Sequence, residues 1–142
     1  MTIARLIEGR KAAILTCNAD LPVRDAIALL AQRRIGALPV MADGRIAGIF
    51  SERDVIYQLQ ANGPAMLDSP VGEVMTSPAV TVDPQTEVLA ALSLMTRRRI
   101  RHLPVVQEDE LIGFVSIGDL VKVRIDRIES EAEALRTYIQ SA

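Results

Sequence analysis

Residues 48–54 read Gly-Ile-Phe-Ser-Glu-Arg-Asp, and residues 113–119 read Gly-Phe-Val-Ser-Ile-Gly-Asp. The shared glycine, serine and aspartate belong to a longer repeat, since Thr16–Tyr57 aligns with Thr81–Lys122 without a gap and 13 of the 42 aligned positions are identical. Chance would give about one identity in 17 positions at average composition, so the chain contains a duplication. The fold is therefore predicted to consist of two copies of one unit.

The first copy predicts this unit element by element. Ile14–Cys17 is a short apolar strand, and an amphipathic helix begins at Val23 after a polar turn that contains proline. Leu38–Met41 and Ile46–Phe50 are short apolar strands joined by a tight turn, as in a hairpin. A second helix is expected to start at Ser51. The unit is thus β-α-β-β-α, an α/β fold of the α+β type.

The second copy predicts the same order, with strands at Ala79–Val82, Leu103–Val106 and Leu111–Val115. A short apolar helix is expected before each copy, at residues 3–7 and 71–75. A unit of about 60 residues with a three-stranded sheet is marginal alone, so the copies should pack about a pseudo-two-fold axis and form two clefts. The single module of residues 1–142 divides into repeat 1 (11–61), a linker (62–70), repeat 2 (71–124) and a C-terminal helix (125–142).

The repeated Gly-x-x-Ser-x-x-Asp segment lies where a strand turns into a helix, and it allows two interpretations. One is a capping box, in which Ser51 or Ser116 caps the helix and Asp54 or Asp119 bonds back to it without any ligand. The other is a binding site. The free N–H groups and partial positive charge of a helix start favour phosphate, and an aspartate can accept two hydrogen bonds from a ribose diol. The interpretations are compatible, because a capped helix end can also bind.

On these motifs, together with the repeated Leu38-Pro39-Val40 and Leu103-Pro104-Val105, the chain resembles the CBS domain (cystathionine β-synthase domain), and the pair resembles a Bateman module. The resemblance covers nearly the whole chain. It implies binding of AMP, ADP, ATP, S-adenosylmethionine or an NAD(H)-type dinucleotide in clefts between the repeats. It also implies that the two motif aspartates hold ribose hydroxyls and that the two motif serines lie near the first phosphate.

The resemblance further implies that each cleft uses both repeats. The cleft of Ser116 and Asp119 would take its adenine-side wall from repeat 1, and the cleft of Ser51 and Asp54 would take its wall from repeat 2. The expected wall residues are Leu21, Ala26 and Ile46 in repeat 1 and Thr86, Ala91 and Leu111 in repeat 2. Small side chains at the two alanines would leave room for a purine, although alanines on a helix are equally expected in a plain core.

The copies differ where a phosphate would lie, since Arg101-His102 stands at the positions of Gly36-Ala37. The resemblance implies that basic residues at these positions meet phosphate. Arg101 and His102 are therefore expected to make the Asp119 cleft favour additional phosphates, while Arg53 partly replaces the missing charge in the Asp54 cleft. The alternative is an arginine cluster at residues 97–101 that is only solvated.

The composition argues against several other classes of protein. The net charge of −2, the 3% aromatic content and the absence of tryptophan disfavour a nucleic-acid-binding surface. No apolar run indicates a signal sequence or a membrane span, so a cytoplasmic location is expected. One cysteine and one histidine offer no disulfide framework, no histidine-based metal site and no catalytic triad, so we expect no enzymatic activity and no catalytic or metal-binding residues.

The stretch from Asp119 to Ala142 contains neither glycine nor proline. Its apolar residues alternate at spacings of four and three, as in a coiled-coil seam: Val121, Ile125, Ile128, Ala132, Leu135 and Ile139. The seam is shorter than the about three to four heptads of a free coiled coil. The segment is therefore expected either to make a homodimer contact, as the resemblance implies, or to fold back on its own core.

Two functions remain open on the sequence. The first is a regulatory module that senses an adenosine-containing nucleotide and signals to an unknown partner protein by a conformational change. The second is a structural protein-interaction module whose clefts hold no nucleotide and whose Ser-x-x-Asp segments are only helix caps. The presence of two intact motifs favours the first function.

Overall fold

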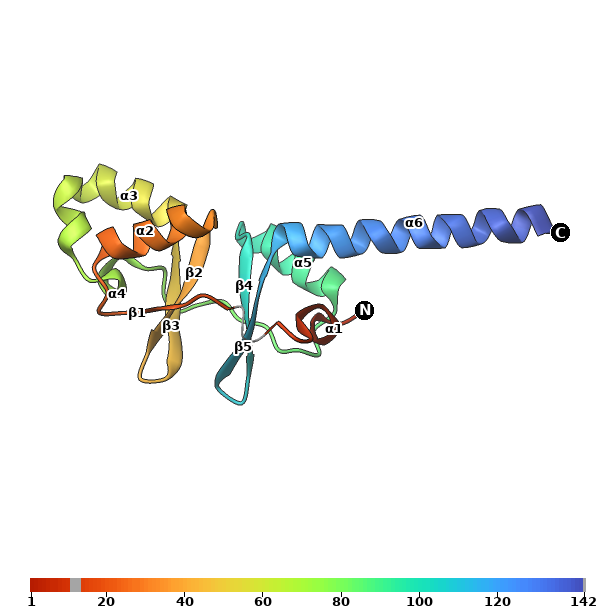
Figure 1. The fold of residues 1–142 in the computed structure, drawn as a ribbon, viewed down its shortest axis with the longest axis horizontal. Helices are drawn as coiled ribbons and strands as arrows, with labels where there is room; N and C mark the ends of the chain where they lie inside the picture. The colour runs from red at the N-terminus through yellow and green to blue at the C-terminus, as the bar shows by residue number, and fades with distance from the viewer. Residues whose placement is uncertain (11–13, 142) are drawn as a thin grey trace.

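A computed structural model describes residues 1–10 and 14–141 (Figure 1). Residues 11–13, at the start of predicted repeat 1, and residue 142, at the end of the predicted C-terminal helix, lie outside the described residues. Figure 1 shows two units of helix and sheet side by side along the long axis, with one long helix extending beyond the second unit. The predicted α+β class, with two repeated units and a final helix, is confirmed.

The first unit has a mixed sheet of three strands, β1 (Cys17–Asn18), β2 (Ala37–Ala42) and β3 (Arg45–Ser51), in that order. β1 is parallel to β2, and β2 is antiparallel to β3. The strand predicted at Ile14–Cys17 is displaced to Cys17–Asn18, and it ends there because the chain turns where the Leu21 N–H donates to the Asn18 carbonyl (3.0 Å). The helices of this unit are α2 (Val23–Arg33), between β1 and β2, and α3 (Glu52–Asn62), directly after β3.

The second unit contains α5 (Val88–Arg98), β4 (His102–Gln107), β5 (Glu110–Ser116) and the start of α6 (Ile117–Ser141). The strand predicted at Ala79–Val82 is reduced to one parallel bridge between Val82 and Val105. Prolines at positions 78 and 84 bracket this segment, and a proline has no N–H with which to extend a ladder. Among the described residues, the second sheet is therefore the antiparallel pair of β4 and β5 alone.

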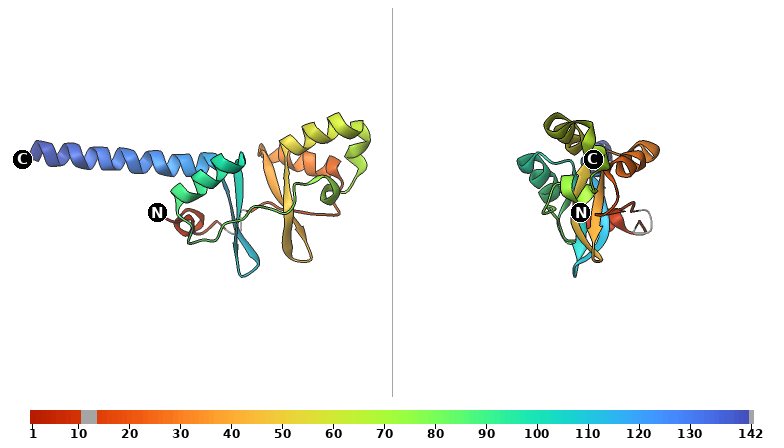
Figure 2. Two further views of the ribbon diagram at one scale, coloured as in Figure 1. Left: turned by 180° about the vertical axis from the view of Figure 1, so that it is seen from behind. Right: turned by 90° about the vertical axis from the view of Figure 1, so that its left-hand side faces the viewer.

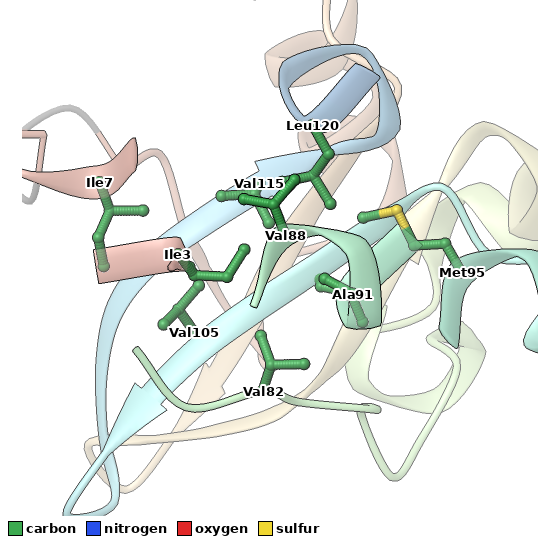
Figure 3. Packing of buried hydrophobic residues seen from close by; sticks show 10 residues of the cluster. Ile3, Ile7, Val82, Val88, Ala91, Met95, Val105, Val115 and Leu120 are labelled. Atoms are coloured by element: carbon green, nitrogen blue, oxygen red, sulfur yellow. The ribbon is translucent and has the colours of Figure 1, made fainter. Parts of the chain in front are cut away.

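Each unit is completed by the short helix that precedes the other repeat in sequence. The helix α1 (Ile3–Ile7) packs in the second unit, where Ile3 joins the hydrophobic cluster of Val105 (Figure 3). The helix α4 (Val71–Val74) packs in the first unit, where both of its valines join the cluster of Val40. This exchange joins the repeats into one module, because each hydrophobic core includes a short helix that stands ahead of the other repeat in the sequence.

The predicted linker is not an open loop. Gly63–Asp68 forms a 3₁₀ helix, η2, and its Met66 side chain is buried in the first core. Because η2 and α4 both pack on the first unit, residues 71–74 lie with repeat 1 in space although they stand at the start of predicted repeat 2. Cys17 is buried in the same core, and burial raises the pKa of its thiol to about 11.

The helix α6 leaves the body soon after it starts. Leu120 is buried in the second core, and this part of α6 contacts α5. The rest of the helix projects away from both units, as both views along its side show (Figures 1 and 2), and residues 125–131 and 133–141 are exposed. The expectation that this segment folds back on its own core is therefore wrong, and its apolar seam is left exposed.

Candidate functional site

Both Gly-x-x-Ser-x-x-Asp segments form capping boxes. In the first repeat the Ser51 N–H donates to Asp54 Oδ2 (2.9 Å), and the Asp54 N–H donates to Ser51 Oγ (3.4 Å). In the second repeat the Ser116 N–H donates to Asp119 Oδ2 (2.9 Å), and the Asp119 N–H donates to Ser116 Oγ (3.1 Å). The capping interpretation is confirmed, and the caps fix each aspartate at the first turn of its helix.

The motif glycine is required because another segment of chain crosses the strand at that position. A Cβ atom on Gly48 would lie 2.6 Å from the Thr76 carbonyl oxygen and 2.7 Å from Met75 Sδ. A Cβ atom on Gly113 would lie 2.8 Å from Ile7 Cγ2. The crossing residues belong to α1 or directly follow α4, so these glycines admit the exchanged helices that complete each unit.

The start of α3 opens into a cleft between the repeats, which we call the Asp54 cleft, with a volume of about 270 Å³. Ser51, Arg53 and Asp54 come from repeat 1, whereas residues 98–102 come from repeat 2. Arg53 Nη1 donates to the Arg99 carbonyl oxygen (3.0 Å), which joins the start of α3 to the end of α5. Among the described residues, four arginines (53, 98, 99 and 101) and two carboxylates (52 and 54) line this cleft.

The start of α6 opens into a second cleft, which we call the Asp119 cleft, with a volume of about 570 Å³. Ser116 and Asp119 come from repeat 2, whereas Leu15, Ile35 and Ala37 come from repeat 1. The charged residues among its described lining are two arginines (10 and 33) and one carboxylate, that of Asp119. Each cleft therefore uses both repeats, as the sequence resemblance implies.

The structure places Arg101 in a different cleft from the one to which sequence reasoning assigned it. Arg101 lines the Asp54 cleft and not the Asp119 cleft, whereas His102, like Ala37, lines both. The Asp54 cleft combines the helix start of repeat 1 with residues 98–102 of repeat 2, and the Asp119 cleft combines the helix start of repeat 2 with Arg33 and Ile35 of repeat 1. The residues ahead of β4 therefore face Ser51, whereas sequence reasoning placed them with the motif of their own repeat.

The predicted adenine-side walls lie elsewhere in the structure. Ala26 and Ala91 are fully buried, one in each hydrophobic core, so the core interpretation of these alanines holds in this structure. The lining of neither cleft includes the four other predicted wall residues, which are Leu21, Ile46, Thr86 and Leu111. The apolar walls are instead formed by residues such as Ile49 and Val80 in the Asp54 cleft and Phe114 in the Asp119 cleft.

Sequence reasoning missed Thr76, which lines the Asp54 cleft directly after α4. Thr76 Oγ1 donates to Asp54 Oδ1 (2.8 Å), so this carboxylate has a partner on each oxygen. Comparison of the repeats could not find this residue, because the aligned position in repeat 1 is a lysine, Lys11. The exchange of α4 between the units is what brings Thr76 to Asp54.

His102 lies in the wall that separates the two clefts. Its ring stacks on Phe114, with ring centroids 5.4 Å apart and 13° between the planes. Burial and the nearby Arg101 charge lower the pKa of His102, and the carboxylates of Asp119 and Glu52 oppose this effect. The His102 imidazole therefore lies near charged groups from both clefts. Sequence reasoning had assigned His102 to the Asp119 cleft only.

Two further features of the described residues bear on the class of site. Within residues 1–10 and 14–141, no three His, Cys, Asp or Glu side chains gather where they could hold a metal ion. In the same part of the chain, every helix is too short or too polar to cross a membrane.

Comparison with known proteins gives consistent matches along the chain. The CBS domain family model matches twice, over residues 11–61 and 71–126. The chain is 40% identical over 131 residues to the mitochondrial CBS domain-containing protein CBSX3 of Arabidopsis thaliana, and the match covers 89% of this chain and 64% of that protein. This chain thus spans somewhat less than two thirds of that relative.

Two solved structures share the fold over nearly their whole length. A protein with CBS domains from Burkholderia ambifaria superposes with a TM-score of 0.81 at 37% identity, covering 89% of this chain and 95% of that chain. The structure of CBSX2 in complex with AMP superposes with a TM-score of 0.75 at 26% identity, covering 88% of this chain and 96% of that chain.

Proposed function

This chain belongs to the CBS domain family, and from that premise we propose that it is a regulatory module that senses an adenosine-containing nucleotide. The ligand class is AMP, ADP, ATP or an NAD(H)-type dinucleotide. It binds in the clefts between the two repeats, and the module signals to a target protein by a change of conformation. The module performs no chemistry on the nucleotide.

The position of the two capped helix starts carries this proposal, since each lies at a cleft built by both repeats. A helix start attracts an anion through its free N–H groups and its dipole. Arginines stand near both helix starts, and their planar guanidinium groups suit phosphate. Asp54 and Asp119 stand at the same openings, where a carboxylate can accept hydrogen bonds from ribose hydroxyls.

The shared construction of the clefts supports the signalling role. A nucleotide that contacts the motif of one repeat and the residues ahead of the hairpin in the other would bridge the two units. It would favour the relative position of the units that it binds best, and binding would shift the population toward that position. The adenosine class is further supported by CBSX2, a structural relative that is 26% identical and whose structure holds AMP.

Two measurements on the purified protein test the proposal. Native mass spectrometry is expected to reveal a retained adenosine compound, and calorimetry with AMP, ATP and NAD⁺ is expected to show binding, with GMP as a weaker control. Ligand at one hundred times its dissociation constant should stabilise the fold by about 2.7 kcal/mol. An absence of binding to every adenosine compound at millimolar concentration would overturn the sensing function.

A second candidate function rests on the completeness of the capping boxes. Each serine and aspartate already satisfies its partner without a ligand, which is what a purely structural protein-interaction module requires. That function predicts unchanged melting temperatures with every nucleotide. A nucleotide-dependent rise in melting temperature decides for the sensing module.

A further inference from the structure

The helix α6 carries an apolar face that no described residue covers. Five residues of its seam are 40–64% exposed: Val121, Ile125, Ile128, Leu135 and Ile139. A single helix projecting into water gains little stability from propensity alone, and most helical stability comes from packing an apolar face. The face therefore requires a partner, and the charged residues beside it indicate which one.

The seam defines the heptad positions of α6. The a positions are Ile125, Ala132 and Ile139, and the d positions are Val121, Ile128 and Leu135. The charged residues on the two sides of this seam are Arg124 and Glu131 at g and Lys122, Glu129 and Arg136 at e. On each side of the seam these charges change sign from one heptad to the next, so they discriminate between possible partners and orientations.

We propose that α6 binds α6 of a second copy of this chain as a parallel, in-register, two-stranded coiled coil. In a parallel pair, each g side chain faces the e side chain of the next heptad on the other helix. Arg124 then faces Glu129 of the second copy, and Glu131 faces Arg136 of the second copy. Both contacts join opposite charges, and the two-fold symmetry makes each of them twice.

The antiparallel arrangement brings like charges together. When two antiparallel seams overlap fully, g faces g and e faces e. Glu131 then meets Glu131, Glu129 meets Glu129, and Lys122 meets Arg136 of the second copy. Like charges placed opposite one another disfavour that arrangement, so the helix complements itself in the parallel orientation.

Existing ion pairs on α6 do not prevent this pairing. Arg127 pairs with Glu131 (3.2 Å) and Arg136 pairs with Glu133 (3.3 Å), all within one helix. These side chains are 53–72% exposed, so the pairs contribute little. Arg124 and Glu129 have no ion pair among the described residues. They are therefore the cleanest pair for a test.

Parallel pairing also determines where the two bodies lie. The helix α6 runs away from the second unit along the long axis of the molecule (Figure 1). Two parallel helices therefore place both bodies at the same end of the coiled coil, with the second units nearest each other. An antiparallel pair would place the bodies at opposite ends.

Cysteine cross-linking tests the orientation in the full chain. In the parallel pair residue 139 faces residue 139, so Ile139→Cys should form an intermolecular disulfide under mild oxidation. Thr137→Cys, on the outer face of the same turn, is the matched control and should cross-link much more slowly. The native Cys17 will not interfere, because it is 6% exposed and its pKa is raised to about 11. Equal rates for the two variants, or no cross-linking of Ile139→Cys, would overturn the parallel pair.

A charge exchange tests the register by sedimentation equilibrium. Glu129→Arg and Arg124→Glu should each raise the dimer dissociation constant about three- to tenfold, because each places like charges opposite one another. The double variant Arg124→Glu/Glu129→Arg should restore the constant of the unmodified protein. Ile128→Glu should raise it by about a hundredfold or more, since it places carboxylates in the seam.

Thr137→Glu controls for an added charge outside the seam and should leave the dimer unchanged. Unaltered melting of the body in each variant shows that folding is intact. A chain that stays monomeric at all concentrations, or a double variant no better than its single variants, contradicts the proposal.

Discussion

The Asp54 cleft and the Asp119 cleft arise from one repeated unit, yet they differ in size and charge. The Asp54 cleft encloses about 270 Å³ and carries four arginines, whereas the Asp119 cleft encloses about 570 Å³ and carries two, among the described residues. The capping boxes are the same in both, so the repeat sets the common helix starts. Arginines 98, 99 and 101 of the Asp54 cleft come from the opposite repeat, whereas Arg53 belongs to the motif itself and aligns with Gly118 of the second motif.

A sequence difference between the repeats changes the charge of the cleft that holds the motif of the other repeat. Arg101 belongs to repeat 2 but lines the cleft of the repeat 1 motif, and its aligned residue, Gly36, has no charge and does not line the Asp119 cleft. Thr76 adds a second difference, because it occupies Asp54 Oδ1, whereas Asp119 Oδ1 accepts no hydrogen bond from the described residues. We therefore expect the Asp54 cleft to favour phosphate-rich ligands and the Asp119 cleft to hold the ribose more strongly.

Removing each motif aspartate in turn is expected to change the ligand affinities of the two clefts the most. In the proposed role Asp119 accepts two hydrogen bonds from a ribose, and bonds to charged groups contribute roughly 1.5–3 kcal/mol each. Asp119→Ala should therefore weaken binding in its own cleft at least about tenfold. Asp54→Ala should weaken its own cleft less, because Thr76 already shares that carboxylate. Calorimetry with each variant measures the two affinities.

The same aspartate variants separate binding from capping. Loss of a cap should lower the free energy of unfolding by about 1 kcal/mol in either variant. If the melting temperature falls while the affinity for AMP stays unchanged, the aspartates are caps only and the ribose role is wrong.

Alanine substitutions at Gly48 and Gly113 test how closely another segment of the chain packs against each motif glycine. A Cβ on Gly48 would lie 2.6 Å from a backbone carbonyl oxygen, whereas the three atoms nearest a Cβ on Gly113 are side-chain atoms of Ile7, the first at 2.8 Å. Overpacking lowers the free energy of unfolding by about 1–3 kcal/mol. The loss should be near the upper end of this range for Gly48→Ala, because backbone cannot easily move, and near the lower end for Gly113→Ala, because the Ile7 side chain can shift. Urea denaturation measures both. If Gly113→Ala loses as much free energy of unfolding as Gly48→Ala, or more, the contrast between a backbone contact at Gly48 and a side-chain contact at Gly113 is wrong.

Arg101→Ala tests the charge difference between the clefts. Loss of one charge-assisted hydrogen bond to phosphate should weaken AMP or ATP binding in the Asp54 cleft about tenfold and affect adenosine far less. Arg97→Ala is the matched control, since Arg97 is exposed in the same arginine run but lines neither cleft. If the loss appears in the Asp119 cleft instead, the sequence-based assignment of Arg101 was correct.

The smallest expected effect is a pH dependence of stability from His102. Its pKa is lowered in the folded protein by burial and by Arg101, against the opposing carboxylates of Asp119 and Glu52. The unfolded chain, with an ordinary histidine pKa of about 6.5, then binds this proton more readily than the folded protein, so stability is lost as pH falls below that value.

Urea denaturation of the unmodified protein and of His102→Ala measures this effect. The variant places in repeat 2 the alanine that repeat 1 carries at position 37. Between about pH 7.5 and pH 5.5 the unmodified protein should lose more stability than the variant. Parallel pH profiles would show that His102 does not titrate differently on folding.

The sequence by itself determined most of the features that depend on neighbours along the chain, although not the 3₁₀ helix at Gly63–Asp68. The duplication, the order of helices and hairpins, the capping boxes from Ser51 and Ser116, and the seam of α6 all follow from local spacing. Such features are readable because a helix start, a hairpin turn or an apolar stripe is set by residues a few positions apart.

Only the tertiary structure decided which distant segments meet. The exchange of α1 and α4 between the units, the contact of Thr76 with Asp54 and the placement of Arg101 in the Asp54 cleft join residues far apart in sequence. The burial of Ala26 and Ala91 was undecided for the same reason, since an alanine on a helix fits a core and a cleft wall equally well. Packing of apolar surface is non-directional, so its partners are selected by the shape of the whole fold.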